Sequence, residues 1–464
     1  MTTAPNSLPD GALLAFFGDD FTGSSAVMEV LTFAGLKTVM FVAPPSAAEL
    51  QRFAGYRAIG IASVARAQAP AWMDEHLPPA FEALAALGAP INHYKICSTL
   101  DSSPALGSIG RAIDIGVPIF ERRQGVADWQ PLLVAAPAIR RYQAFGNLFA
   151  VHDGTGYRLD RHPVMRDHPA TPMHEADVRL HLGAQTARPL GLVDVAAIKD
   201  GTGEARFTAE LAAGRRLVAL DVVDDETLAW CGGLIWNKRD EGLFAVGSQG
   251  IEYALVAYWR AAGLLPAAPA AMAAAAVEQI VAVSGSVSSV TAEQIDWAEA
   301  HGFDVIGLEA GLAVDAGQWQ AELARAVERA GEILSAGRSP LLVTARGPGD
   351  AAVGRTQAAV AAVHLDPAIV NARIGSGLGS AAASLLRTGG VRRLVVSGGD
   401  SSGFAVGSLG IFALEAIAPL APGAPLCRAF AAAPASDGLE IALKGGQMGR
   451  PDYFGSVRAG RAAS

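Results

Sequence analysis

The chain has 464 residues, of which 51% are hydrophobic and 17% charged, and its formal net charge is -9. One hydrophobic core rarely serves so long a chain, which predicts two domains and leaves a third open. The acidic balance argues against a nucleic-acid-binding protein, because neutralising phosphates requires an excess of Lys and Arg. A small anionic ligand remains compatible, since helix N-termini and a few cations make a site locally positive.

Cysteines are few, far apart and odd in number: Cys97, Cys231 and Cys427. Without a CxxC pair they indicate neither a disulfide framework nor a zinc site, which is typical of a reducing compartment. The first residues lack a basic n-region, and Pro, Glu and Gln interrupt the alanine-rich segment 266–283. We therefore expect a cytoplasmic protein with neither an export signal nor a membrane span.

Strand-like apolar runs alternate with helical periodicity in the first half of the chain. The pattern predicts strands at 13–18, 37–43, 57–63 and 91–99, separated by helices, which is typical of βα units around a mostly parallel sheet. The segment 145–181 breaks this rhythm with five histidines and several Pro-containing turns. It predicts irregular structure that enters a helix over Pro172–Leu182, with Thr171 as the N-cap.

The alternation returns after residue 190 and again in a second set of α/β units. Residues 265–277 are rich in Pro and Ala without apolar periodicity, which predicts a linker between domains at 1–265 and 266–464. The strands of the second domain are expected within 280–286, 304–310, 339–347 and 392–403. The predicted fold class is thus two α/β domains, each with a mostly parallel sheet flanked by helices, and an active site in the interdomain cleft.

Small-residue turns end several strands of the second domain. They occupy 284–288, 344–349 and 397–403, and a fourth turn, LKGGQMG, spans 443–449. Glycines let the backbone approach a phosphate, while free N–H groups and a following helix N-terminus favour its charge. One such turn is as readily a tight connection, but several on one sheet edge favour a polyphosphate or nucleotide.

A further glycine string, GSGLGS at 375–380, is a weak match to a dinucleotide fingerprint. It follows NARI rather than a long strand, and its third glycine comes too early for GxGxxG. An NAD-dependent sugar-acid dehydrogenase is thus only weakly supported, and it is kept as an alternative function from another class. The chain also has no Walker motif and no protein-kinase signature, so a nucleotide-using enzyme here belongs to another superfamily.

Two polar turns of the first domain indicate a ligand site. Asp19 and Asp20 follow an apolar strand, and the segment after the fourth strand supplies Lys95 and a run of small polar residues, namely Ser98, Thr99, Asp101, Ser102 and Ser103. These donors and acceptors suit a polyhydroxylated carboxylate, although such residues are also common in solvated turns. The histidines have irregular spacing and no HExxH pair, so no metal site is expected.

Taken in order, the motifs resemble the four-carbon acid sugar kinase family, whose members phosphorylate tetronates and 3-oxo-tetronates. The resemblance runs through GDDFTG, KICSTLDSS, the segment from 158 to 182, VGSQG, SGSVSSVTAEQI, VVSGGDSSG and LKGGQMG. It implies a substrate-binding N-terminal domain, an ATP-binding C-terminal domain and phosphorylation of a terminal hydroxyl. The implied ATP contacts are Ser284 or Ser286, Gly398, Gly399, Asp400, Ser401 and Gly446.

Phosphoryl transfer assigns roles to the remaining candidates. It needs Mg²⁺ at the phosphates and a carboxylate that orients or deprotonates the acceptor hydroxyl, for which we predict Asp20 or, failing that, Asp19. The acceptor's own carboxylate needs a cation, and Lys95 and Arg161 are the candidates, with His162 next to them.

Two further interpretations of the ligand chemistry stay open. A branched acid, 3-oxo-isoapionate, is an alternative acceptor, because one branch alters only a few contacts. A non-catalytic sugar-acid sensor is disfavoured by the many phosphate-type turns. The expected partners are a sugar acid and ATP, not nucleic acid or membrane, and the oligomeric state is open, a homo-oligomer included.

Overall fold

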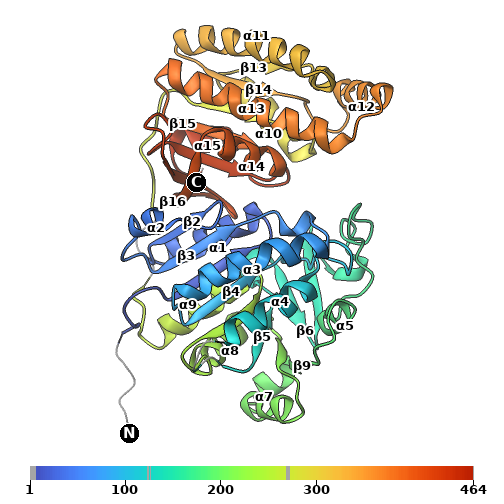
Figure 1. Ribbon diagram of the computed structural model, residues 1–464, viewed down its shortest axis with the longest axis vertical. Helices are drawn as coiled ribbons and strands as arrows, with labels where there is room; N and C mark the ends of the chain where they lie inside the picture. The colour runs from blue at the N-terminus through green and yellow to red at the C-terminus, as the bar shows by residue number, and fades with distance from the viewer. Residues whose placement is uncertain (1–6, 123–124, 126, 268–271, 463–464) are drawn as a thin grey trace. The chain divides into compact units, whose positions relative to one another are not determined.

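The computed structural model describes residues 7–122, 125, 127–267 and 272–462. Contacts divide the chain into two compact units, Met1–Pro269 and Ala270–Ser464 (Figure 1). Within the predicted linker, residues 268–271 lie outside the described residues, and the rest of it forms neither helix nor strand. Both units are α/β structures with a mostly parallel sheet, so the predicted class of two α/β domains is confirmed, while the active site in an interdomain cleft stays a prediction.

Unit 1 is built on a parallel sheet with the strand order β2-β3-β1-β4-β11-β5-β10-β9. A parallel strand is covered on both faces, which is why β1 reads LAFFG and is buried throughout. The strands are β1 (Leu14–Gly18), β2 (Thr38–Phe41), β3 (Ala58–Ala62), β4 (Ile91–Lys95), β5 (Gln130–Leu133), β9 (Leu190–Val193), β10 (Leu217–Leu220) and β11 (Leu243–Gly247).

The helices of unit 1 form two packed groups. One group joins α3 to α4, and the other joins α9 to α1 and α8. Figure 1 shows α3 and α4 side by side along the strands. The helices are α1 (Phe21–Phe33), α2 (Ala47–Gln51), α3 (Pro70–Ala86), α4 (Ile109–Glu121), α5 (Val178–Gly183), α6 (Val195–Lys199), α7 (Gly203–Ala212), α8 (Asp225–Asn237) and α9 (Gly250–Ala261).

The chain reverses its direction of winding between β1 and β4. From β1 it passes through α1 to β2 and then β3 on one side, and α3 carries it back to β4 on the other side. Gly18 pairs in register with Ala62 and with Lys95, so β1, β3 and β4 end level with one another. Loops that leave in opposite directions open a crevice at such a switch point, where α/β proteins bind ligands.

The segment 145–181 is more regular than predicted. It contributes to a small antiparallel sheet of β6 (Arg141–Ala144), β7 (Asn147–His152) and β8 (Thr155–Arg158). The predicted helix over Pro172–Leu182 is wrong, because α5 begins at Val178 with Asp177 as its N-cap. Thr171 does not cap a helix, since its hydroxyl donates to the Asp101 carboxylate.

Unit 2 repeats the arrangement around its first strand. Its order is β13-β14-β12-β15-β18-β17-β16, in which β17 pairs antiparallel with both β18 and β16 and the other pairings are parallel. The chain moves from β12 to β13 and β14 on one side and returns to β15 on the other, which places a second switch point between β12 and β15. The strands are β12 (Val281–Ser284), β13 (Phe303–Gly307), β14 (Ser339–Val343), β15 (Arg393–Ser397), β16 (Ile411–Ala421), β17 (Ala424–Ala431) and β18 (Glu440–Lys444).

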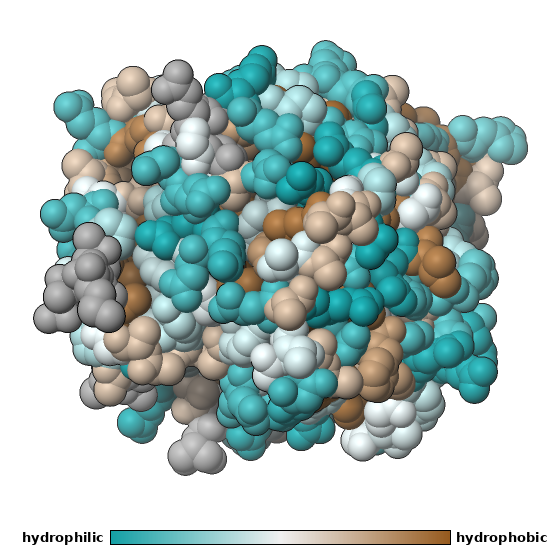
Figure 2. Space-filling model, turned by 90° about the horizontal axis from the view of Figure 1, so that it is seen from below, coloured by the Kyte–Doolittle hydropathy of each residue, from teal (hydrophilic) through white to brown (hydrophobic). Residues whose placement is uncertain are grey.

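Helices of unit 2 also pack in two groups. One group joins α13 to α11 and α14, and the other joins α10 to α15 over a core that includes Phe303 and Tyr453. The helices are α10 (Ser289–Ala300), α11 (Ala316–Ser335), α12 (Ala351–Val363), α13 (Pro367–Gly389), α14 (Gly399–Ser408) and α15 (Tyr453–Ala459). Among the described residues of either unit, no helix combines the length and apolarity needed to cross a membrane. Figure 2 shows apolar residues scattered between hydrophilic ones on one face of the molecule.

The glycine string 375–380 lies inside α13 and forms no loop. A Cβ on Gly375 would collide with Phe404, and one on Gly377 would collide with Trp319. A Cβ on Gly379 would come within 2.8 Å of the Ala405 Cα. These glycines let α11 and α14 approach α13 closely, so the dinucleotide reading of the string is overturned by its helical packing.

Substituting two helix glycines of unit 2 tests this packing role. Gly377→Ala should lower the free energy of unfolding by about 1–3 kcal/mol, because the methyl group overpacks against buried Trp319. Gly331→Ala, in α11, should instead raise it by about 0.5–1 kcal/mol, since nothing lies within 4 Å of the new Cβ and Ala has the higher helix propensity. Urea unfolding followed by circular dichroism measures both, and equal effects of the two variants would contradict this account.

Candidate functional site

Two adjacent carboxylates follow β1 at the switch point of unit 1. Asp20 is the N-cap of α1, and its Oδ1 accepts a hydrogen bond from Gly23 N at 2.9 Å. Asp19 is only 1% exposed. Arg66, in the turn after β3, donates from Nη2 to Asp19 Oδ1 at 2.6 Å and to Asp20 Oδ1 at 2.7 Å, and from Nε to Asp19 Oδ2 at 3.2 Å. One guanidinium therefore holds both carboxylates in place.

Lys95 ends β4 beside this pair. It is buried and donates from Nζ to Ile96 O at 2.7 Å. A Cβ on Gly23 would lie 2.6 Å from that Nζ, which accounts for the glycine in GDDFTG. Burial raises the pKa of Asp19, while Arg66 acts to lower it.

The formal charges of the two aspartates are balanced by those of Arg66 and Lys95. Within the described chain, Asp20 Oδ2 has no hydrogen-bond partner, and the Asp20 side chain is 27% exposed. The Asp20 carboxylate thus keeps one oxygen for a ligand. The sequence analysis missed Arg66. The one signal for it was its position shortly after β3, the strand that lies next to β1.

The loop after β4 brings further predicted residues to the same edge. Thr99 is buried, Ser98 is half-buried, and Cys97 Sγ lies 3.1 Å from Thr99 Oγ1. Leu100 adopts φ +51°, an unusual value for a residue with a side chain. Asp101 accepts the Thr171 hydroxyl, so the loop is tied to the segment that follows β8.

The remaining substrate candidates lie elsewhere in unit 1. Arg161 is 77% exposed and has its nearest carboxylate, Asp160, at 4.0 Å. His162 is buried, and its Nδ1 accepts from Val164 N and Met165 N at 3.2 and 3.3 Å, which leaves the proton of the neutral ring on Nε2. Burial and the nearby Arg141 guanidinium lower the pKa of His162. The structure shows no contact of either residue with the Asp19 and Asp20 pair.

Arg141, on β6, is a cation that the sequence analysis missed. Its Nη1 donates to the carbonyls of Ile139 and Arg140 at 3.2 Å, and its buried Nε has no partner among the described residues. No described carboxylate lies within ion-pair distance of it. Cys97 is within electrostatic reach of both Arg141 and Arg66, so the two guanidiniums lie near the same loop.

In unit 2, three of the predicted turns meet at the second switch point. Ser284 pairs in register with Ser397, and Ser397 with Lys444, so β12, β15 and β18 end level. Gly285 N donates to Ser397 O at 3.0 Å, and Gly398 N donates to Lys444 O at 2.9 Å. The turn 344–349 differs, because its Arg346 pairs with Asp296 and Glu299 on α10.

Four hydroxyls gather at this edge, and we call Ser286, Ser288, Thr291 and Ser397 the hydroxyl cluster. Ser288 Oγ donates to Gly446 O at 2.5 Å, and Thr291 Oγ1 lies 3.1 Å from Ser286 Oγ and 3.4 Å from Ser397 Oγ. A Cβ on Gly446 would come within 2.6 Å of Ser286 Oγ, so only glycine fits there. The cluster links the β12 and β18 turns into one surface.

The turn after β15 leads directly into α14. Gly398 has φ +123°, a value that favours glycine, and Gly399 and Asp400 form the first turn of the helix. Ser401 is buried, and its Oγ lies 3.1 Å from where a Cβ on Gly398 would be; the Asp400 side chain lies outside the described part of the structure. No side chain caps α14 at Gly398, so its first N–H groups are available to an anion.

Lys444 completes the unit 2 edge. It is 1% exposed and donates to Thr291 Oγ1 at 3.1 Å and to Gly445 O at 3.2 Å. Burial lowers its pKa to about 8. The glycine turn had drawn attention to this segment, but the residue's complete burial has no signature in the sequence.

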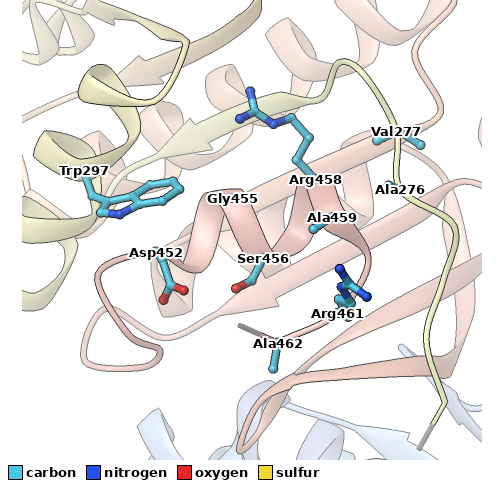
Figure 3. Close-up of a pocket in the computed structure, with 10 residues that line it drawn as sticks. All are labelled: Ala276, Val277, Trp297, Asp452, Gly455, Ser456, Arg458, Ala459, Arg461 and Ala462. Atoms are coloured by element: carbon cyan, nitrogen blue, oxygen red, sulfur yellow. The ribbon is translucent and has the colours of Figure 1, made fainter. Parts of the chain in front are cut away.

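The described residues contain no cluster of metal ligands, and they form a cavity outside the two strand edges. No group of three or more His, Cys, Asp or Glu side chains in them is arranged to hold a metal ion. A cavity of about 620 Å³ between α10 and α15 is lined by Trp297, Arg458 and Arg461 among others (Figure 3). Trp297 stacks on His301 and Arg458 donates to the His301 carbonyl, so these side chains already serve packing.

Comparisons with known proteins agree with this division of the chain. A model of a sugar-binding N-terminal domain matches residues 14–255, and one of a nucleotide-binding C-terminal domain matches 281–454. The 3-oxo-isoapionate kinase of Paraburkholderia graminis is 48% identical over 461 residues, covering 99% of this chain and 97% of the relative. The 3-oxo-tetronate kinase of Methylobacterium radiotolerans is 32% identical, covering 95% and 97%.

Solved structures share the fold. A DUF1537-family protein of Haemophilus influenzae has a TM-score of 0.72 at 23% identity, covering 96% of this chain and 99% of its own. At that identity the likeness shows the fold alone, and the two domain models and the kinase relatives carry the assignment. The chain therefore belongs to the four-carbon acid sugar kinase family and is an ATP-dependent kinase of sugar acids.

Proposed function

We propose that this chain phosphorylates a hydroxyl of 3-oxo-isoapionate. The observation that carries the proposal is the 48% identity to a kinase named for that acid, against 32% and 30% to two kinases named for 3-oxo-tetronate. The four-carbon 3-oxo-tetronate is the second candidate, because a relative with that name still covers 95% of the chain. A terminal hydroxyl is the acceptor atom that we infer for either acid.

A coupled assay of ADP release tests the acceptor. With Mg²⁺ and ATP, we expect kcat/KM for 3-oxo-isoapionate to exceed that for D- and L-3-oxo-tetronate, threonate and erythronate by at least about tenfold, since a branch that fills a pocket contributes about 1–3 kcal/mol. A reaction without acceptor controls for ATP hydrolysis. A preference for a 3-oxo-tetronate would assign the chain to the second candidate instead.

The two carboxyl edges suit the two substrates of such a kinase. Unit 1 offers Asp20 to the acceptor hydroxyl, whose oxygen bonds to the γ-phosphorus as the bond to ADP breaks and its proton passes to Asp20. Unit 2 offers glycine turns, hydroxyls and Lys444 to the nucleotide. Transfer requires both edges to face one cleft, which stays a prediction. Mg²⁺ would be bound mainly by the phosphates of ATP, because magnesium sites of this kind use only one or two carboxylates of the protein.

We assign different roles to the two aspartates, because Asp20 has an oxygen with no partner among the described residues and Asp19 is buried against Arg66, and substitution tests the division. Asp20→Asn should lower kcat by about 10²- to 10⁴-fold with little change in unfolding, because it removes the carboxylate with the free oxygen. Asp19→Asn should instead reduce the free energy of unfolding by about 1–3 kcal/mol, because it weakens the pairing of Arg66. Steady-state kinetics and urea unfolding measure these effects. If both variants kept a normal kcat, neither aspartate would be the base.

Arg141 is the cation that we assign to the carboxylate of the acid. The charges around Asp19 balance one another. Arg141, in contrast, pairs with no carboxylate among the described residues, and its Nε has no hydrogen-bond partner there. A guanidinium binds a carboxylate through two parallel hydrogen bonds, which would give this charge its partner. Arg161, predicted for this role from the sequence, is largely exposed and serves as the comparison.

The matched pair Arg141→Lys and Arg161→Lys tests this assignment. Arg141→Lys should raise KM for the acid at least about tenfold and leave KM for ATP unchanged, because it keeps the charge but loses the bidentate contact. Arg161→Lys should change neither constant by more than about twofold. The opposite result would return the carboxylate to Arg161, and a rise in KM for ATP alone would exclude both.

A further inference from the structure

Lys444 is a buried cation to which the described residues supply no counter-charge. It is the one lysine in the sequence between residues 270 and 464, where every other basic side chain except histidine is arginine. Its two hydrogen-bond acceptors, Thr291 Oγ1 and Gly445 O, are both neutral. No described carboxylate lies within ion-pair distance. Burying an ammonium without an anion is costly, so such a group commonly marks a site that a ligand completes.

On the elements packed around Lys444, the neighbours that the structure describes carry no charge. On α10 it faces Thr291, and on β15 its strand neighbour is Ser397, both neutral. On α15 the ring of Tyr453 lies 5.9 Å from Nζ, and the Tyr453 hydroxyl is engaged by Ala424 O. On α14 the described neighbour of the turn is Ser401, while Asp400 on the same helix has a side chain outside the described part.

The surroundings are those of a phosphate site. An ammonium has three N–H donors, and Lys444 uses two of them within the described protein. Hydroxyls of the hydroxyl cluster and the first N–H groups of α14 lie at the same edge, which adds neutral donors and a helix N-terminus. Burial lowers the pKa of Lys444, and no neighbouring anion offsets this effect within the described protein.

We propose that Lys444 binds the terminal phosphates of the nucleotide and does so as the ammonium, so that nucleotide binding takes up a proton at alkaline pH. The inference rests on the proposed function, which assigns the nucleotide to this edge of unit 2. The phosphates supply the missing counter-charge, which raises the pKa of Lys444 in the complex. Between the pKa values of the free and bound protein, affinity falls as pH rises.

The pH range follows from the sign of the shift. In the free protein, burial lowers the pKa of Lys444 to about 8, below the ordinary value of 10.5 for a lysine. Below pH 7 the ammonium is present before binding, and no proton is needed. Near pH 8 about half of the molecules must gain a proton, and near pH 9 nearly all must. The association constant for ADP should therefore fall about fivefold between pH 8 and pH 9, and about tenfold per pH unit above that.

Isothermal titration calorimetry with ADP on the full-length protein measures this uptake. Titrations at pH 6.5, 8 and 9, each in two buffers of different ionisation enthalpy, give the number of protons exchanged. We expect net release at pH 6.5, where the terminal phosphate of ADP still carries part of a proton and Lys444 is already protonated. Uptake should then reach about half a proton at pH 8 and about one at pH 9, where the phosphates of ADP no longer titrate. Absence of uptake at pH 9 in the unmodified protein would overturn the proposal without any variant.

Three substitutions locate the proton. Lys444→Met should abolish the uptake and weaken ADP binding at pH 7 at least about tenfold, with an unfolding transition in urea no lower than that of the parent. Lys238→Met, at a 44% exposed lysine of unit 1, is the matched control and should change neither property. Asp400→Asn should leave the pH midpoint of uptake within about half a unit; a fall in the midpoint would show that Asp400 is already the counter-ion and overturn the proposal.

The result also separates this inference from the proposed function. ADP binding with proton uptake but no turnover of any acid would uphold the role of Lys444 and reject the proposed acceptor. Turnover of 3-oxo-isoapionate with uptake unchanged in Lys444→Met would do the reverse. Failure of the unmodified protein to bind ADP at any pH would overturn the assignment of the nucleotide to unit 2 and the role of Lys444 together.

Discussion

The chemistry of this chain depends on a reversal of winding that occurs once in each unit. In unit 1 the loops leave β1 and β4 in opposite directions, and in unit 2 they leave β12 and β15 in the same way. Because the paired strands end in register, residues next to the strand ends come to a common edge without any contact near them in sequence. Asp19 and Lys95 are 76 positions apart in the sequence. Asp19 directly follows β1 and Lys95 is the last residue of β4, which is the neighbouring strand.

The two edges solve the electrostatic problem of burial in different ways. In unit 1, two carboxylates, Arg66 and Lys95 neutralise one another inside the protein, so the geometry around Asp20 is preorganised before any ligand binds. In unit 2, Lys444 has no such partner among the described residues. The first edge keeps its shape through internal ion pairs, whereas we propose that the second gains its last favourable interaction from a phosphate.

Periodicity and turn chemistry were enough to predict the fold class, and the ordered motifs were enough to predict the family, both of which are confirmed. The end of β1 was visible because its apolar run stops before Asp19, whereas the strands predicted at 91–99 and within 280–286 run past the ends of β4 and β12 at Lys95 and Ser284. The ion pair of Arg66 and the isolation of Lys444 and Arg141 depend on which strands become neighbours, and no local pattern encodes that.

The errors have the same origin. The helix predicted from Pro172 had a good local signal, a threonine before a proline, but a distant carboxylate, Asp101, takes the threonine hydroxyl. The glycines at 375–380 resemble a loop in sequence, and the large side chains of Trp319 and Phe404 show why a helix needs them. In both cases tertiary contacts override local preference.

The bond between Thr171 and Asp101 joins the loop after β4 to a segment that lies outside the main sheet. That segment, 159–177, carries little regular structure, but Leu159, Met173 and Ala176 anchor it in the interior of unit 1. Its conformation is therefore coupled to that of Asp101 and of the loop to which we assign the acid. A substitution at an exposed position of this segment can alter that loop while the sheet that holds Asp19 and Asp20 stays as it is.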